Sequence, residues 1–470
     1  MRHAFLLAIA VLFGAVGHAR AAEQVEPGFF FTSSGLVSFT AIALLPQPNG
    51  DQTLVFAWPF QSGVCNDVVC IGIDRWNASG ARIGSTRLKS TALDTIAAAT
   101  VDSRGRIIVV GRYQGAGSNG GEFGVVRFKA DGSDDTSLAG DGNTYVDFGG
   151  GGSNFDNPLA VAVDADDNIL VAGSAERASP GDSDFAVARL RASDGSLDTS
   201  FSSDGKNLVF FDLGPDSRLD QAYAVTVRND GKIVLGGTAL DSVIARRRPV
   251  MAQLNKDGSL DTGFCNTNCN FNAGYSGVNT GKRVYYFGTL TSHTDEILDV
   301  DVASNNDIVI AGATYAEDGS TRRAAIARFT GAGVQTSERL EVGFDSNARF
   351  TGVRFADGSG TRVIAVGDIG AGPNLFLAQR FTASLSPDTT YGYTFFCLPD
   401  ASGLCFAGAG EFGDFGPNAA GKLHLDARGR PLFAGTFVRS SDSGRGSLVS
   451  VRISNISGPL PDRIFRNGLQ

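Results

Sequence analysis

GSLDTSFSSDGK at residues 195–206 and GSLDTGF at residues 258–264 are two versions of one short sequence. Each follows an aspartate directly, and Asp-Gly pairs favour tight turns because glycine tolerates left-handed backbone. A turn sequence that recurs within one chain indicates a structure built from repeated units. We therefore expect a repeat architecture.

Seven copies of a longer unit can be aligned around this turn. Each copy has a short apolar strand, and turn residues that suit a hairpin precede that strand. The strands end in glycine in six copies, and the first copy is degenerate: LVFAW 54–58, IIVVG 107–111, ILVAG 169–173, IVLGG 233–237, IVIAG 308–312, VIAVG 363–367 and PLFAG 431–435.

A later strand of each copy carries an arginine followed by a large apolar residue. The arginines are Arg75, Arg127, Arg189, Arg328, Arg380 and Arg452, and one copy departs with Gln253. A residue repeated from unit to unit serves the scaffold, so we expect these arginines to pair between strands or between units. With a weaker fourth strand, each unit reads as a four-stranded antiparallel meander.

The strands mix alanine, glycine and valine and have no clean polar face, which is typical of sheets covered on both sides. Sheets stacked radially around an axis are covered in this way. We therefore predict an all-β fold, a seven-bladed β-propeller of four-stranded antiparallel blades. A β-solenoid is the rival fold, but its repeats are usually shorter and lack a hairpin in every unit.

DGKIVLGG, FAVARL and GSLDTSF, all within residues 155–264, resemble the delta-60 repeat. This repeat occurs in bacterial exported β-propeller proteins of unknown function. The resemblance implies a β-propeller and export, and it implies no activity, since the family carries no shared catalytic motif.

The chain ends fall outside the repeats. Residues 1–21 have a basic start, an apolar run and a small-residue cleavage site, which predicts a signal peptide. Residues 22–458 then form one propeller domain and residues 459–470 a short tail. The end of this tail, PDRIFRNGLQ at residues 461–470, resembles a terminal sequence of some secreted proteins. We expect a secreted, periplasmic or cell-surface protein with no membrane span, since no later apolar run is long enough.

The six cysteines form three close pairs in the sequence. In an exported protein they are expected to form local disulfides: Cys65 with Cys70, Cys265 with Cys269, and Cys397 with Cys405. Other connectivities remain open. The formal net charge of −9 argues against nucleic acid as a partner.

No catalytic motif stands out. The chain has no Gly-x-Ser-x-Gly sequence, and beyond the leader it has only His293 and His424, which limits triads and zinc sites. No cofactor or metal is expected, although calcium in one Asp-rich turn stays open because these turns match the EF-hand pattern only in part.

An aspartate column marks the start of the first strand: Asp94, Asp156, Asp220 and Asp295. Such residues could hold a cation or polar ligand, but the favoured interpretation is that each accepts backbone N–H groups from an adjoining loop.

Departures from the repeat are the candidate ligand-binding residues. Arginine doublets occupy aligned places in two adjacent copies, and four polar residues replace small ones in the first-strand column of the fifth and seventh copies. The candidates are Arg247, Arg248, Arg322, Arg323, Asp299, Asp301, Lys422 and His424. We expect Asp299 and Asp301 to face the channel or a polar blade interface, where Lys422 and His424 could oppose them.

The preferred function is an exported, non-enzymatic and monomeric binding or surface-interaction module, with a protein or glycan at one rim. The alternatives are a metal-assisted hydrolase or lactonase-like enzyme with carboxylates at the channel, and a cell-surface scaffold. Carboxylates that hold a divalent ion would favour the enzyme, and an aromatic or basic rim would favour binding.

Overall fold

The computed structural model describes residues 24–25, 40–58, 69–84, 87–90, 93–114, 121–149, 155–177, 181–214, 219–265, 281–288, 294–315, 322–340, 348–356, 359–369, 375–388, 393–396, 423–426, 430–438 and 446–454. The signal peptide and the tail predicted from the sequence lie outside these residues. No helix of the described part is long and apolar enough to cross a membrane.

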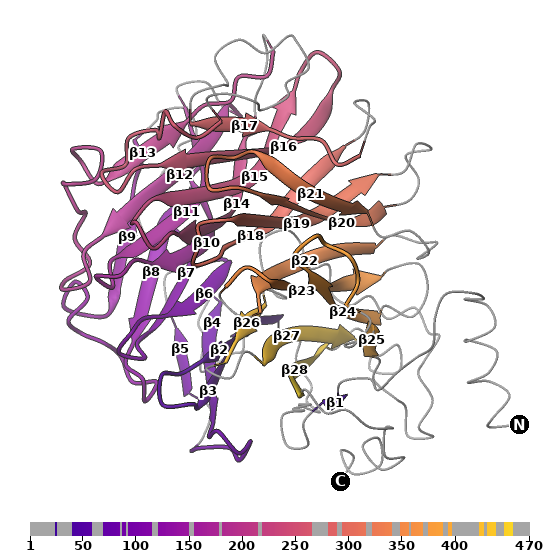
Figure 1. Ribbon diagram of the computed structural model, residues 1–470. Helices are drawn as coiled ribbons and strands as arrows, with labels where there is room; N and C mark the ends of the chain where they lie inside the picture. Colours follow the sequence, from indigo (N-terminus) through magenta and orange to yellow (C-terminus); the bar gives the residue numbers. More distant parts are fainter. Residues whose placement is uncertain are drawn as a thin grey trace, which may run out of the picture.

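Six sheets are built from four strands that follow one another in the chain, and we number these blades 1 to 6 (Figure 1). Blade 1 has β2 (Thr40–Pro46), β3 (Gln52–Trp58), β4 (Cys70–Trp76) and β5 (Arg87–Ser90). Blade 2 has β6 (Ala98–Val101), β7 (Ile107–Tyr113), β8 (Glu122–Phe128) and β9 (Asn143–Val146). Blade 3 has β10 (Asn157–Val163), β11 (Ile169–Glu176), β12 (Ser183–Leu190) and β13 (Lys206–Val209).

The second half of the ring continues in the same manner. Blade 4 has β14 (Gln221–Val227), β15 (Ile233–Asp241), β16 (Arg246–Leu254) and β17 (Lys282–Val284). Blade 5 has β18 (Asp295–Val302), β19 (Ile308–Tyr315), β20 (Arg322–Phe329) and β21 (Gln335–Leu340). Blade 6 has β22 (Ala348–Phe355), β23 (Arg362–Ile369), β24 (Leu375–Thr382) and β25 (Tyr393–Phe396).

The remaining sheet joins the two ends of the chain. Its order is β1 (Gln24–Val25), β28 (Gly446–Ser454), β27 (Pro431–Val438) and β26 (His424–Leu425), and β2 of blade 1 packs against β27. The prediction of seven repeated blades is therefore wrong. Six blades are complete meanders, and the last copy supplies only three strands to a composite closing sheet whose fourth strand comes from the other end of the chain.

The first copy is also shifted relative to the sequence alignment. Arg75 pairs with Thr53, as Arg127 pairs with Ile108 in blade 2. Phe56 therefore stands where the other copies have glycine, and a side chain at Gly72 opposite would lie 2.2 Å from the Phe56 ring. The Phe56 ring lies over Gly72, and a phenylalanine in place of the usual glycine makes the repeat hard to recognise here.

The innermost strands of five blades each contain a register shift, in β2, β10, β14, β18 and β22. A bulge re-aims the extra side chain away from the regular pleat. In β10, β14 and β18 the extra residues are Leu159, Tyr223 and Leu298, and these three buried side chains form one cluster. The inner strands therefore contact one another through their bulges.

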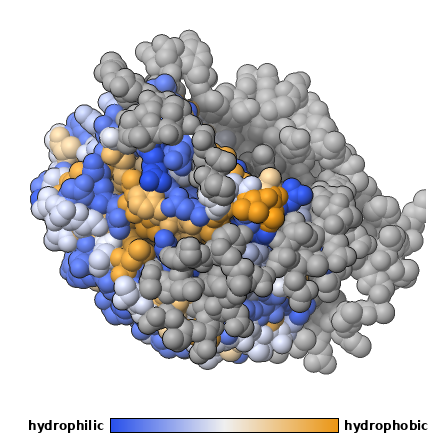
Figure 2. All heavy atoms as spheres, turned by 90° about the horizontal axis from the view of Figure 1, so that it is seen from above, coloured by the Kyte–Doolittle hydropathy of each residue, from blue (hydrophilic) through white to orange (hydrophobic). Residues whose placement is uncertain are grey.

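The face seen from above is mixed in polarity. Orange hydrophobic residues gather toward the middle of its described part, between blue hydrophilic residues (Figure 2).

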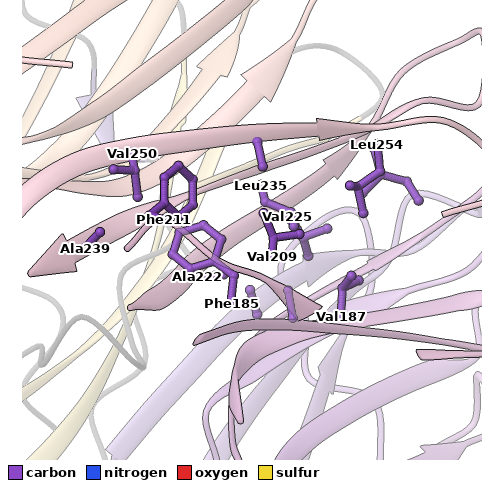
Figure 3. Packing of buried hydrophobic residues seen from close by; sticks show 14 of the residues in the cluster. Phe185, Val187, Val209, Phe211, Ala222, Val225, Leu235, Ala239, Val250 and Leu254 are labelled. Carbon is purple, nitrogen blue, oxygen red and sulfur yellow. The ribbon is translucent and has the colours of Figure 1, made fainter. Parts of the chain in front are cut away.

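The core consists of separate apolar layers between neighbouring blades. Between blades 3 and 4, side chains from both sheets interdigitate, and Phe185 and Phe211 meet edge to face with ring centroids 5.0 Å apart (Figure 3). Burial of such side chains contributes about 1.5–3 kcal/mol each. Because every central strand is covered on both sides, the sequence shows no polar face.

Arg189 explains one part of the repeated turn sequence. It lies at the end of β12, where its Nε donates to Asp198 at 2.8 Å and one Nη donates to Ser200 at 3.0 Å. The other Nη donates to the carbonyl of Lys256 in blade 4 at 2.6 Å. The Asp and Ser of LDTS therefore orient an arginine that bridges to the next blade. Arg127 makes the equivalent three contacts, to Asp135, Ser137 and the Ala192 carbonyl of blade 3.

Phe201 explains the other part. The N–H of the following residue, Ser202, donates to the Asp257 carbonyl of the next turn at 2.7 Å. A Cβ at Gly258 would lie 2.9 Å from the Phe201 ring, so only glycine leaves room for it. The turn sequence repeats because each turn receives the phenylalanine and the arginine of the preceding blade.

Blade 4 keeps this link with different residues. Gln253 replaces the arginine and still donates to Asp261 at 2.6 Å, while Arg228 donates to the Gly331 carbonyl of blade 5 at 2.7 Å. Arg283 donates to the nearby Gly333 carbonyl, and burial lowers its pKa to about 10. The bridge is thus required, but its donor can change position.

We predict that Arg189→Ala lowers the free energy of unfolding by about 1–3 kcal/mol, because it leaves the half-buried Asp198 carboxylate and the Lys256 carbonyl without the buried guanidinium that joins them. Arg191→Ala removes an exposed arginine whose Nε lies 4.0 Å from the same carboxylate, and it should change stability by less than about 0.5 kcal/mol. Urea unfolding followed by circular dichroism measures both. Equal losses of unfolding free energy in the two variants would show that the Arg189 bridge contributes no more to stability than an exposed arginine.

Candidate functional site

The aspartate column lies at the rim where the innermost strands begin. Asp156, Asp220 and Asp295 are buried there, at the starts of β10, β14 and β18. One oxygen of each accepts a backbone N–H from the preceding loop: Phe148 at 2.9 Å, Phe211 at 3.1 Å and Phe287 at 3.1 Å. Asp94 in blade 2 instead pairs with Arg112 at 2.9 Å. These contacts hold loops to blades.

Three buried carboxyls at this rim resist ionisation. Burial raises the pKa of Asp156 to about 7, against the hydrogen bonds from Phe148 and Glu176. Burial also raises the pKa of Asp184 to about 7, and Arg177 opposes the shift. For Asp220, burial and the adjacent Asp184 charge raise the pKa to about 8. Each group therefore favours its protonated form in the fold.

The two arginine doublets lie at equivalent places at the starts of β16 and β20. Their register to β15 and β19 matches residue for residue. Arg248 is buried, forms an ion pair with Asp241 at 3.4 Å and lies over the Tyr286 ring. Arg322 is half-buried and Arg323 is exposed. Arg248 therefore has a structural role within blade 4, whereas Arg247, Arg322 and Arg323 are closer to solvent.

Arg247 differs from its neighbours because its partners are neutral. One Nη donates to the Tyr223 hydroxyl at 3.0 Å and to Gln221 Oε1 at 3.2 Å, and Tyr223 itself donates to Gln221 at 2.6 Å. Within the described part of the chain Arg247 has no ion-pair partner, and its Nε and second Nη make no hydrogen bond. A half-buried guanidinium is thus held in place by neutral oxygens with its charge uncompensated.

The same register position in blade 5 has a different charge. Glu296 takes the place of Gln221, and Leu298 takes the place of Tyr223. The charge of Glu296 also acts on Tyr223, whose pKa is raised by burial and lowered by Arg247. In blade 4, therefore, the Arg247 cation contacts a neutral residue, Tyr223, at the bulge of the innermost strand.

Asp299 and Asp301 lie at the interface between blades 5 and 6. Asp299 accepts the Val353 N–H at 3.0 Å and pairs with Arg354 at 2.6 Å, and Asp301 accepts the Phe355 N–H at 2.7 Å. Burial raises the pKa of Asp301 to about 6, against the charge of Arg354. These carboxylates satisfy backbone donors on the edge of the neighbouring inner strand.

The residues expected opposite this pair are only partly described. His424 is half-buried in β26, in the register column of Asp301 and Arg354, whereas Lys422 lies outside the described residues. Of the six cysteines, Cys70 and Cys265 are described, both are buried, and neither is a free thiol. The other four lie outside the described part, so local pairing stays a prediction.

Sequence reasoning missed Tyr223, Gln221 and Arg354. Tyr223 is inserted by a bulge and looks in sequence like one more apolar strand residue. Arg354 was detectable, because it occupies the column in which Asp301 was recognised. Among the described residues no group of three or more His, Cys, Asp or Glu is arranged to hold a metal ion.

Three segments match the family described as a domain of unknown function (DUF5122) beta-propeller, at residues 105–138, 165–201 and 228–264. These are the second, third and fourth copies, including both arginine bridges and the turns that receive them. The chain is a β-propeller repeat protein. No match was found among the curated proteins.

Solved structures with similar folds are distant in sequence. Polysaccharide lyase Uly1 has 11% identity and a TM-score of 0.45, over 93% of this chain and 91% of that chain. A neuraminidase-like protein of subtype N11 from A/flat-faced bat/Peru/033/2010 has 10% sequence identity and a TM-score of 0.39, over 95% of this chain and 99% of that chain. The β-propeller domain of the trilobed protease from Pyrococcus furiosus has 8% sequence identity and a TM-score of 0.40, over 89% of this chain and 100% of that chain.

The protonated carboxyls give a pH-dependent stability. Because their pKa values are raised above the usual value of 3.8, the folded protein binds more protons than the unfolded chain between about pH 4 and pH 8, and stability falls as pH rises through this window. We expect Asp220→Asn to reduce that fall in chemical denaturation measured at pH 5 and pH 8. The surface substitution Asp166→Asn is the control. A slope unaltered by Asp220→Asn would contradict the assignment.

The Asp299–Arg354 pair can be separated from general destabilisation by a double-mutant cycle. Asp299→Ala installs the residue of blades 2 to 4 in this column, and Arg354→Thr installs that of blades 2 and 4. We expect Asp299→Ala alone to cost about 3 kcal/mol, and the pair to show a coupling of about 1–3 kcal/mol. Additive losses would mean that the two side chains act independently.

Proposed function

We propose that this propeller is an exported binding module that takes the anionic group of a ligand, such as the carboxylate of an acidic glycan, at Arg247. The observation that carries the proposal is a half-buried guanidinium whose partners, Tyr223 and Gln221, are neutral. Export by residues 1–21 and three local disulfides belong to the same proposal.

The geometry of Arg247 suits a carboxylate. One Nη is used by the two oxygens, so Nε and the other Nη remain for a ligand, and these two nitrogens form the edge that binds a carboxylate or sulfate in a bidentate manner. Tyr223 and Gln221 fix the side chain in advance, which lowers the entropy lost on binding. In solution the same guanidinium would bind weakly because water competes.

The surrounding charge sets the conditions for binding. The whole chain is acidic, with a formal net charge of −9, so long-range attraction does not deliver an anion to this rim. Affinity must come from short-range contacts to Arg247, with Arg322 and Arg323 on the adjacent blade as further positive charges. We therefore expect moderate affinity that decreases as salt rises.

The test is binding of the purified protein to a fluorescently labelled oligouronate, followed by polarisation at several salt concentrations. Because a hydrogen bond to a charged group contributes about 1.5–3 kcal/mol, Arg247→Gln should weaken binding by at least about tenfold. Arg247→Lys should recover only part of the loss, since lysine lacks the planar fork.

Arg246→Gln is the matched control, because Arg246 is the exposed neighbour on the same strand. It should change the dissociation constant less than about twofold. Thermal unfolding checks that all variants fold. Equal losses in Arg246→Gln and Arg247→Gln, or binding of Arg247→Gln at wild-type strength, would reject the proposal.

A further inference from the structure

The outer strand of blade 2 breaks the repeat with an exposed tyrosine. Tyr145 in β9 pairs with Gly124 of β8, and 56% of its surface is accessible to solvent. The same register position in blades 3, 4 and 5 holds smaller aliphatic residues that are buried or half-buried: Leu208, Val284 and Leu340. Tyr145 is therefore not required by the blade.

A second tyrosine supports the first. Tyr113, at the end of β7, stacks on Tyr145 with ring centroids 4.8 Å apart and an angle of 5° between the planes. The equivalent position is alanine in blades 3 and 4, at Ala175 and Ala239, and threonine in blade 5, at Thr314. Blade 2 therefore has a fixed, flat aromatic surface at a place where the other blades have small side chains.

Gly124 makes this arrangement possible. A Cβ at that position would lie 3.0 Å from the Tyr113 Cβ and 2.3 Å from a Leu93 methyl carbon. The absence of a side chain lets both rings lie over the strand. The three departures from the repeat, two tyrosines and one glycine, thus form one structure.

Polar groups border the two rings. Glu122 lies directly opposite Tyr113 in the register, is 8% exposed, and its Oε2 has no hydrogen-bond partner within the described part of the chain. Burial, with a further contribution from Asp147, raises the pKa of Glu122. The Oδ1 of Asn143, two residues before Tyr145 on the same face of β9, is also buried without a partner. Asp147, two residues after Tyr145, is exposed, and its carboxylate is an acceptor that a hydroxyl-rich ligand can reach.

We propose that Tyr145, supported by Tyr113, is a stacking platform for a sugar ring of a neutral glycan. The apolar face of a pyranose packs on an aromatic ring, while its hydroxyl groups need acceptors at the edge. The exposed carboxylate of Asp147 disfavours an anionic ligand by charge, so this surface differs in chemistry from the rim at Arg247. The inference does not rest on the proposed function.

The experiment measures binding of the intact protein to neutral gluco-, manno-, galacto- and xylo-hexasaccharides by saturation-transfer NMR and calorimetry. We expect at least one to bind, with the strongest transfer to ring protons of one sugar. Tyr145→Leu should weaken binding at least about tenfold, and Tyr145→Phe should stay within about threefold, because it keeps the ring.

Leucine is the matched replacement, because blades 3 and 5 fold with leucine at this position. Arg247→Gln should leave neutral-glycan binding unchanged, which separates this proposal from the preceding one. Absence of binding to all four hexasaccharides, or wild-type binding by Tyr145→Leu, would overturn the inference. Binding of a proline- or tyrosine-rich peptide at Tyr145, with no binding of the sugars, would overturn it in favour of a protein partner.

Discussion

The arginine that crosses from one blade to the next is the interaction on which the ring depends. A guanidinium buried between two sheets is tolerated only when its donors are satisfied, and Arg127 and Arg189 each use a carboxylate, a hydroxyl and a carbonyl of the following turn. The carboxylate and hydroxyl belong to the arginine's own blade, whereas the carbonyl belongs to its neighbour. Each bridge therefore fixes the orientation of one blade relative to the next.

Blade 4 shows that the requirement is physical rather than tied to one position. With glutamine at position 253, a shorter neutral side chain still reaches Asp261, and the charge moves to Arg228 and Arg283 on other strands of the same blade. The acceptors remain carbonyls of the next turn, at Gly331 and Gly333. A repeat can thus lose its most regular residue without losing the contact it makes, which limits what sequence conservation between copies can reveal.

Much of the fold could be predicted from the sequence, because strand, turn and arginine columns follow from local chemistry that each blade repeats. The number of blades could not. The last copy has a strand resembling the others, yet its sheet takes β1 from the far end of the chain, and a two-residue strand carries no detectable pattern. The first copy was aligned wrongly for another reason, since Phe56 stands in its second strand where the other copies have glycine.

The candidate sites followed the same division. Arg247 was detectable as a departure from the repeat, and so were Asp299 and Asp301. The partners of Arg247 were not, because Tyr223 reaches its buried position only through a bulge that shifts the register, and a bulge is a property of two paired strands. The stacked tyrosines of blade 2 also depend on three strands meeting over Gly124, which no single segment encodes.

The topology explains why binding residues and scaffold residues separate. In an antiparallel meander, the turns after the first and third strands lie at one end of the blade, and the loops after the second and fourth lie at the other. The arginine bridges and their acceptor turns occupy the first end. Arg247 and Tyr113 lie toward the second end, where the repeated contacts join aspartates to backbone N–H groups and do not involve these two side chains. Substitutions there leave the links between blades intact, so this rim can acquire charge or aromatic rings while the ring of sheets stays closed.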